Sequence, residues 1–331
     1  MKLAPLKYVI VLLLSLFAFA AQSSVTAKKS LMLMGCGFEL SATATNEAVA
    51  WQAINEGIKE IRRIEKLISS WDPQSQTSAI NASAGQYPVK VNKELYDLIY
   101  RANKVSTLTN GAFDISFASM NKLWLFNQKE QQLPESALVF AARAKINFEN
   151  IVLNPFDTSV YLAEGMRIGF GAIGKGYAAN QAKVLMQAVP GVLGGAVNAS
   201  GDILSWGESN GNTGRKISIA NPKNKMQPIA WLQVKDAAVV TSGDYEKYFT
   251  ANGKRYAHII NPKTGFPSTG VSSVTVICPN AELADALATS VFVLGVKEGL
   301  ALINSLASIE CIIVDDAGEL HQSKNLELNY Y

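Results

Sequence analysis

Apolar residues recur at helical spacing in two long stretches of the chain. Between residues 46 and 68, isoleucines at positions 54, 58, 61, 64 and 68 share one face, and charged side chains occupy the others. This spacing predicts an amphipathic helix, which Trp71-Asp72-Pro73 terminates. Residues 93–109 predict a second helix, which stops at Asn110-Gly111.

The remaining stretches show both strand and helix patterns. We expect helices over 177–188 and 282–294, and strands over 29–42, 271–278 and 309–315, near 196–206, 216–220 and 229–234, and within 145–167. No strict strand–helix–strand rhythm runs through them. This favours an α+β fold over a doubly wound parallel sheet, and it disfavours an ordinary solute-binding protein with two α/β lobes.

Composition and charge narrow the class of protein. The 331 residues are 48% hydrophobic and 17% charged, with a net charge of +3, which is ordinary globular composition. The chain is long enough for one large domain or two smaller ones, and it shows no repeat or low-complexity linker. So weak a charge argues against a dedicated nucleic-acid binder, so we expect no nucleic-acid partner.

The N-terminus has the three parts of a secretory signal peptide. Lys2 and Lys7 precede an apolar run over residues 8–20, and Ala18-Phe19-Ala20 offers a cleavage site. The run is too short for a comfortable membrane span. We therefore expect residues 1–20 to be a signal peptide and the protein to be exported to the periplasm. The alternative is an uncleaved anchor that keeps it at the inner membrane.

The cysteines and histidines are too few for a disulfide framework or a His-rich metal site. Cys36, Cys278 and Cys311 are odd in number and widely spaced, so at most one pair could bridge, and packing in the core is favoured. Only two histidines, His258 and His321, are present.

Asp285 and Thr289 are the first candidate for chemistry. Because residues four apart share a helix face, the carboxylate and the hydroxyl would point the same way on the helix expected at 282–294. Two hard oxygens on one face suit Mg²⁺, which often shares its site with phosphates. The alternative is a solvated or capping acid beside a packed threonine.

A glycine-rich run over residues 169–176 contains Lys175. Glycines let a backbone approach a phosphate closely, and a helix start offers free N–H groups to an anion. The run has the outline of a P-loop, but Gly176 stands where that motif needs a Mg²⁺-binding hydroxyl. We therefore interpret Lys175 as a phosphate contact outside a P-loop, with a tight strand-to-helix turn as the alternative.

His258 is the candidate general base, because a neutral imidazole can accept a proton from a hydroxyl nucleophile. Asn261-Pro262 and Thr264-Gly265 are turn signals that place it at a strand end, where a structural histidine is the alternative. Three further segments are polar turns when taken alone: 111–114, 198–202 and 241–245.

Taken together and in order, these segments resemble the ApbE family of FAD:protein FMN transferases. The series is Met34-Gly35-Cys36, Ser69-Ser70-Trp71 with Ser75 and Asn81, Gly111-Ala112-Phe113-Asp114, Gly169 to Gly176, Ser200-Gly201-Asp202, Thr241-Ser242-Gly243-Asp244-Tyr245, His258 to Gly265, and Asp285-Ala286-Leu287-Ala288-Thr289. The resemblance covers about residues 30–300 and implies an ApbE-like domain over 21–331, with mixed sheets and packed helices in a two-lobed catalytic unit.

The resemblance also implies roles for individual residues. Asp285 and Thr289 match the family's metal-binding side chains, and Ala172 matches the residue that lends a backbone carbonyl to the Mg²⁺. The positions that resemble FAD-contacting residues are Met34, Trp71, Ala112, Phe113, Asp114, Lys175, His258 and Ile259. The chain departs from the family at Gly169 and Asn261, which replace aspartates, at Cys36, which replaces threonine, and at Asn180, which replaces an acid.

The implied reaction is Mg²⁺-dependent transfer of FMN from FAD to a threonine hydroxyl of a partner redox protein, with release of AMP. The implied acceptor carries an exported motif like Asp-x-x-Ser/Thr-Gly-Ala-Thr. Two alternatives share these motifs: a metal-dependent FAD pyrophosphatase that gives FMN and AMP, and a non-catalytic periplasmic FAD-binding protein, which the missing acids at 169 and 261 make conceivable.

Overall fold

A nine-stranded sheet, antiparallel throughout, organises the chain. The computed structural model describes residues 24–120, 123–126, 132–209, 212–222, 227–252 and 254–330. Along the sheet the order is β1, β2, β6, β7, β11, β14, β15 and β16, with β8 paired to β7. The strands are β1 (Val25–Leu33), β2 (Cys36–Ala44), β6 (Val192–Ala199), β7 (Asp202–Ser209), β8 (Asn212–Thr213), β11 (Ala238–Gly243), β14 (Val271–Cys278), β15 (Glu310–Asp315) and β16 (Leu320–Gln322).

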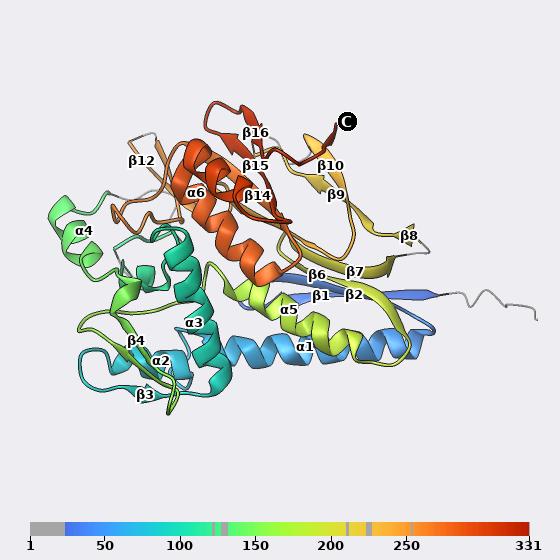
Figure 1. Cartoon of the computed structure of the whole chain (residues 1–331), viewed down its shortest axis with the longest axis horizontal. Coiled ribbons are helices and arrows are strands. Elements are labelled where there is room, and N and C mark those ends of the chain that lie inside the picture. The colour runs from blue at the N-terminus through green and yellow to red at the C-terminus, as the bar shows by residue number, and fades with distance from the viewer. Residues whose placement is uncertain are drawn as a thin grey trace, which may run out of the picture.

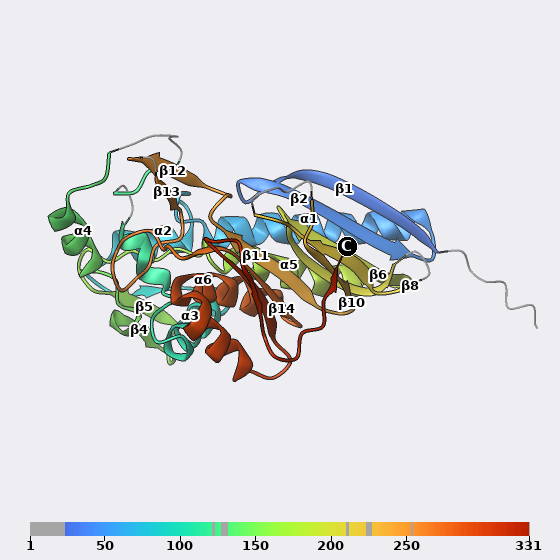
Figure 2. The same ribbon diagram turned by 90° about the horizontal axis from the view of Figure 1, so that it is seen from above.

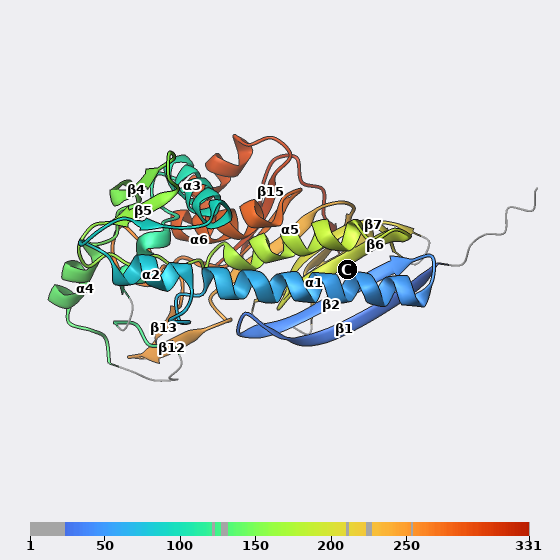
Figure 3. The same cartoon turned by 90° about the horizontal axis from the view of Figure 1, so that it is seen from below.

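Three helices cover one face of this sheet (Figures 1 and 3): α1 (Glu47–Ile68), α5 (Gly174–Gln187) and α6 (Ala281–Asn304). The helix α1 packs on β1 and β2, α5 on β6 and β7, and α6 on β11, β14 and β15, while α5 contacts both neighbouring helices. The isoleucine face of α1 is buried, as the periodicity predicts. Asn46 caps α1 by accepting a 3.0 Å hydrogen bond from the backbone of Val49.

The apolar character of α6 reflects burial in the core. By length and composition alone this helix could cross a membrane. It packs against three strands of the main sheet, and Ala284, Leu287, Ala288 and Val291 are fully buried. Its regular backbone breaks at Gly295, which has φ 79° and ψ −177°.

A second group of elements lies beyond one end of the main sheet, on the left of Figure 1. It contains α2 (Gln76–Ala82), α3 (Lys93–Leu108), α4 (Ser136–Arg143), the 3₁₀ turns η1 (Ile115–Met120) and η2 (Phe148–Asn150), and a sheet of β3 (Val89–Lys90), β5 (Ser159–Leu162) and β4 (Ile151–Asn154). The hairpin of β12 (Tyr248–Ala251) and β13 (Lys254–Ala257) lies near α4 in two views (Figures 1 and 2).

A small sheet covers part of the other face of the main sheet. It consists of β9 (Arg215–Ile219), β10 (Ala230–Val234) and β17 (Asn329–Tyr330). Ile217 and Leu232 of this sheet share an apolar cluster with Val239 and Ile312 of the main sheet. The main sheet is therefore buried between helices on one side and β-structure on the other, at least over β11 and β15.

The α+β prediction is confirmed, and both periodic helices form within one residue of their predicted ends. The prediction of one strand over 29–42 is wrong, because Met34 and Gly35 adopt positive φ of 49° and 73° and turn the chain into a β1–β2 hairpin. Ser200 and Gly201 also adopt positive φ and form the turn between β6 and β7, within the polar turn predicted at 198–202.

Several other boundaries differ from the predicted ones. The helix expected at 177–188 begins at Gly174, and the one expected at 282–294 runs to Asn304. Residues 241–243 belong to β11, where we expected a polar turn. Short helices α2 and α4 escaped prediction because each spans only about two turns. The predicted signal peptide, residues 1–20, lies outside the described residues.

Candidate active site

One cavity of about 120 Å³ collects most of the predicted site residues. Nine of the eleven line it, and they come from four separate segments of the chain: Ala112, Phe113, Asp114, Ala172, Lys175, His258, Ile259, Asp285 and Thr289. The cavity lies where α5 and α6 begin and where β11 ends. Met34 and Trp71 are outside it.

Asp285 is held at the contact between α5 and α6. Its side chain is only 3% exposed, and its Oδ2 accepts a 3.0 Å hydrogen bond from the backbone N–H of Gly176. A Cβ at position 176 would stand 2.1 Å from the carbonyl oxygen of Ala281. Only glycine therefore permits this approach of the two helices, which explains why the residue after Lys175 carries no P-loop hydroxyl.

Lys175 lies between carboxylates. Its Nζ forms an ion pair with Oδ2 of Asp202, whose Oδ1 accepts a 3.0 Å hydrogen bond from the backbone of Thr241. Burial by itself would lower the pKa of Lys175, but Asp202, Asp285 and Glu246 raise that pKa overall, so the ammonium stays charged. The cavity thus contains a fixed positive charge suited to a phosphate.

The donor set around Asp285 suits a hard cation. Burial raises the pKa of the Asp285 carboxyl, Lys175 opposes that rise, and Asp202 adds to it. The hydrogen bond from Gly176 uses only Oδ2, so Oδ1 is left for a ligand. Thr289 lines the same cavity with its Oγ1 3.4 Å from Oγ of Ser242, and Ala172 lies on the wall. Oxygen atoms of this kind fit Mg²⁺.

His258 follows β13 directly, at the strand end predicted for it. Its backbone N–H donates to the carbonyl of Lys247 at 3.0 Å, and its ring lies edge-on to Phe126. Burial lowers the pKa of His258 to about 4, and the charges of Lys247 and Lys175 contribute. Its Nδ1 is buried with no hydrogen-bond partner in the described part of the chain. A neutral imidazole therefore lines the cavity, and its Nδ1 is enclosed by protein.

Asp114 lines the cavity, but its carboxylate is already engaged. Oδ1 accepts hydrogen bonds from the backbone N–H and the hydroxyl of Ser116 at 2.7 and 2.6 Å, and Oδ2 accepts one from the backbone of Phe148 at 2.9 Å. Burial raises the pKa of this carboxyl, and these hydrogen bonds oppose the rise. Asp114 therefore shapes the loop that presents Ala112 and Phe113.

Met34 and Trp71, the two other predicted site residues, do not line the cavity. Met34 sits in the β1–β2 turn, with its Cε 3.6 Å from where a Cβ on Gly174 would be. Trp71 is 80% exposed in the loop after α1. The cavity is smaller than the roughly 300–1,000 Å³ of typical small-molecule pockets, so a dinucleotide would extend from it across the surface.

The sequence analysis assigned no role to several residues of the site, among them Phe117, Asp202, Ser242 and Glu246. Asp202 pairs with Lys175, and the other three line the cavity. Asp202 and Ser242 belong to motifs of the ordered series, and Glu246 follows one directly, so these motifs could have indicated a role for all three. No motif includes Phe117, which lies on η1.

The departures from the family pattern have structural roles here. The Asn261 side chain accepts a 2.9 Å hydrogen bond from the backbone of Lys263 and shapes the turn after His258. Asn180 bonds to the side chain of Asn280 and to the backbone of Ala281, at 2.9 and 3.0 Å, and so secures the start of α6. At Gly169 a Cβ would stand 3.2 Å from that of Ala118, so space for a larger residue is tight.

All three cysteines lie in the described residues, and all are free thiols. Cys278 and Cys311 are buried, as expected for core residues, whereas Cys36 is half-buried beside the charges of Lys175 and Asp202. Burial raises the pKa of the Cys36 thiol.

Known proteins resemble the chain over most of its length. It is 32% identical over 290 residues to the FAD:protein FMN transferase of Klebsiella pneumoniae (strain 342), covering 86% of this chain and 88% of that one. It is also 32% identical over 279 residues to the FAD:protein FMN transferase of Treponema pallidum (strain Nichols), covering 79% and 76%.

Solved structures show the same fold. The ApbE protein of Thermotoga maritima superposes with a TM-score of 0.84 at 28% identity, covering 91% of this chain and 97% of that one. The flavinyl transferase ApbE of Pseudomonas stutzeri gives a TM-score of 0.80 at 22% identity, over 91% and 95%. Residues 34–313, which include every residue of the cavity, match the ApbE family. The chain therefore belongs to the ApbE family.

Proposed function

We propose that this protein is an exported FAD:protein FMN transferase that moves FMN from FAD to a threonine of a partner redox protein. The observation that carries the proposal is the single cavity that unites Asp285, Thr289 and Ala172 with Lys175 and His258, in a member of this family. Relatives that are 32% identical to this chain carry the name of this activity.

The pyrophosphate of FAD binds beside Lys175. The ion pair with buried Asp202 holds the Lys175 ammonium in place, so its charge is available without reorganisation. Mg²⁺ held by Asp285, Thr289 and the Ala172 carbonyl would supply stabilisation of the negative charge that develops on the phosphoryl oxygens. The helix contact at Gly176 keeps the Asp285 carboxylate aimed at this place.

His258 accepts the proton of the attacking threonine hydroxyl. The threonine oxygen bonds to the phosphorus of the FMN moiety, the bond from that phosphorus to the bridging oxygen breaks, and AMP leaves with the electron pair. The pKa of about 4 is low for this task, but the negative pyrophosphate would raise it by favouring the imidazolium.

The rest of FAD extends beyond the cavity. Trp71, 80% exposed, offers a face on which a flat ring can stack, and Met34 lies beside the first turn of α5. We propose that the acceptor carries an Asp-x-x-Ser/Thr-Gly-Ala-Thr-like motif. The predicted signal peptide over residues 1–20 supports a periplasmic location for the encounter.

Intact-protein mass spectrometry tests the proposal. The protein is incubated with FAD, Mg²⁺ and an acceptor domain that carries the motif, and we expect one FMN to be added to the acceptor. The gain should vanish with EDTA and with Asp285→Asn, and it should persist in Glu298→Gln, an exposed acid on the same helix. FMN and AMP without a modified acceptor would establish a pyrophosphatase instead, and FAD binding without turnover would establish a binding protein.

A further inference from the structure

A second group of potential metal ligands lies on the β15–β16 hairpin, and none of its members lines the catalytic cavity. In the hairpin register Ile313 opposes His321 and Val314 opposes Leu320. The register continues to Asp315, whose backbone N–H donates to the carbonyl of Glu319 at 3.1 Å. Since opposite residues share a face and side chains alternate along a strand, Asp315, Glu319 and His321 all project from one face.

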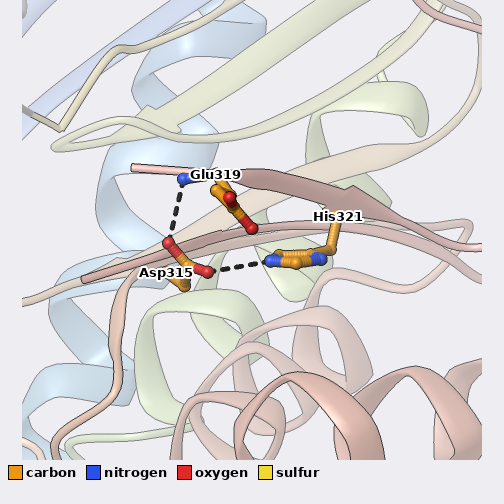
Figure 4. A group of neighbouring side chains, drawn as sticks. All are labelled: Asp315, Glu319 and His321. Carbon is orange, nitrogen blue, oxygen red and sulfur yellow. Dashed lines mark hydrogen bonds and ion pairs between the residues drawn. The ribbon is translucent and has the colours of Figure 1, made fainter. Parts of the chain in front are cut away.

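The three side chains are close enough to share one ion (Figure 4). One ligand atom from each lies within 4.8 Å of the others, and Nε2 of His321 is 3.0 Å from Oδ2 of Asp315. The other oxygen of Asp315 accepts hydrogen bonds of 2.9 Å from the backbone N–H groups of Gly318 and Glu319. Asp315 therefore has one anchored oxygen and one that faces the imidazole.

We propose that Asp315, Glu319 and His321 form a Zn²⁺-binding site. An imidazole with two carboxylates is a donor set that Zn²⁺ accepts, and three protein ligands leave a fourth position for water. Neighbouring ligands of a tetrahedral Zn²⁺ stand about 3.3 Å apart, given bonds of roughly 2.0–2.1 Å. The His321–Asp315 contact of 3.0 Å is already close to that spacing.

Of the three ligands, Glu319 has to move to reach the ion, and its side chain is free to do so. Glu319 is exposed, so a change of rotamer can bring its carboxylate to the ion without disturbing the core. The side chains of Asp315 and His321 are 19% and 29% exposed, so they need little further ordering. The all-oxygen set of the catalytic cavity favours Mg²⁺, whereas a site with an imidazole favours Zn²⁺ over Mg²⁺.

A bound ion would link β15 to β16 and so stabilise the end of the main sheet. The edge strand β16 has three residues and pairs with β15 at three positions. An ion bound only by the folded hairpin stabilises the native state as its concentration rises above the dissociation constant. The site thus has a readout that does not depend on flavin transfer.

Calorimetric titration of Zn²⁺ into the whole protein in excess Mg²⁺ tests this. We expect one equivalent to bind the wild type and Glu298→Gln, with a raised melting temperature. His321→Ala and Glu319→Gln should each weaken binding by at least the roughly tenfold that loss of a supporting contact costs. Glu319 is exposed, so its variant keeps the test informative if His321→Ala folds poorly.

Two outcomes would refute the proposed site. One is no Zn²⁺ binding by the wild type, and the other is wild-type affinity for Zn²⁺ in both Glu319→Gln and a folded His321→Ala. Transfer of FMN with Mg²⁺ should be unchanged in the His321 variant, so a failure of this proposal is distinct from a failure of the proposed function.

Discussion

Replacement of Gly176 by alanine should destabilise the protein, although alanine is the better helix former by about 1 kcal/mol. The residue lies in the first turn of α5, where propensity alone predicts a gain. The new Cβ would stand 2.1 Å from the carbonyl oxygen of Ala281, 2.6 Å from its carbon and 2.9 Å from Cβ of Asp285. Two of these three atoms are backbone, so no side-chain rotation relieves the clash.

The expected size of the effect follows from two losses. Overpacking of a tight contact costs about 1–3 kcal/mol. Separation of α5 from α6 also breaks the 3.0 Å hydrogen bond from the backbone of residue 176 to Asp285, and such a bond to a charged group is worth about 1.5–3 kcal/mol. After the propensity gain, we expect the free energy of unfolding to fall by about 1.5–5 kcal/mol.

Equilibrium denaturation measures this quantity directly, and Gly171→Ala is the matched control. Position 171 belongs to the same glycine-rich run, but a Cβ there would meet Cζ of Phe117 at an ordinary 3.7 Å. The control should change the free energy of unfolding by less than about 0.5 kcal/mol. A Gly176→Ala protein as stable as the wild type, or more stable, would refute the helix-contact argument.

Further predictions concern the charges and rings of the site. Lys175→Met leaves Asp202 buried and unpaired, which should lower the free energy of unfolding by about 3–5 kcal/mol in equilibrium denaturation. In the double variant Lys175→Met/Asp202→Asn part of this stability should return, but FMN transfer should not. Because the pKa of His258 is about 4 when folded and about 6.5 when unfolded, the unfolded state binds the proton first as pH falls. The free energy of unfolding should therefore decrease as the pH falls from 6.5 to 4. His258→Gln should flatten this part of the plot of stability against pH. An unchanged slope in that variant would contradict a buried neutral imidazole at position 258. Trp71→Ala should raise KM for FAD and leave the melting temperature within error, since the side chain is 80% exposed; an unaltered KM would remove Trp71 from the binding surface.

The sequence by itself determined the features that depend on near neighbours in the chain. The isoleucine period predicted α1 from its own residues, because it forms the apolar stripe of an amphipathic helix. The four-residue spacing of Asp285 and Thr289 fixed their shared helix face before any fold was known. The order of the motifs pointed to the family, although each motif alone was an ordinary turn or helix start.

The β1–β2 hairpin is a feature that the local sequence pattern did not predict. Residues 29–42 are continuous enough in apolar character to suggest a single strand, and their turn depends on positive φ at Met34, a residue that seldom adopts it. Pairing with a neighbouring strand is what stabilises such a turn, and pairing is not written in the segment itself.

Only the tertiary structure decided which residues meet at the site. Gly176 and Asp285 are 109 residues apart, and Lys175 and Asp202 are 27 apart, so no window along the chain contains either pair. The carboxylate of Asp114 accepts hydrogen bonds from Ser116 in its own loop and from the distant Phe148, and the pKa of His258 is lowered by burial. Burial and charge pairing depend on which segments meet in space, and that is a property of the whole fold.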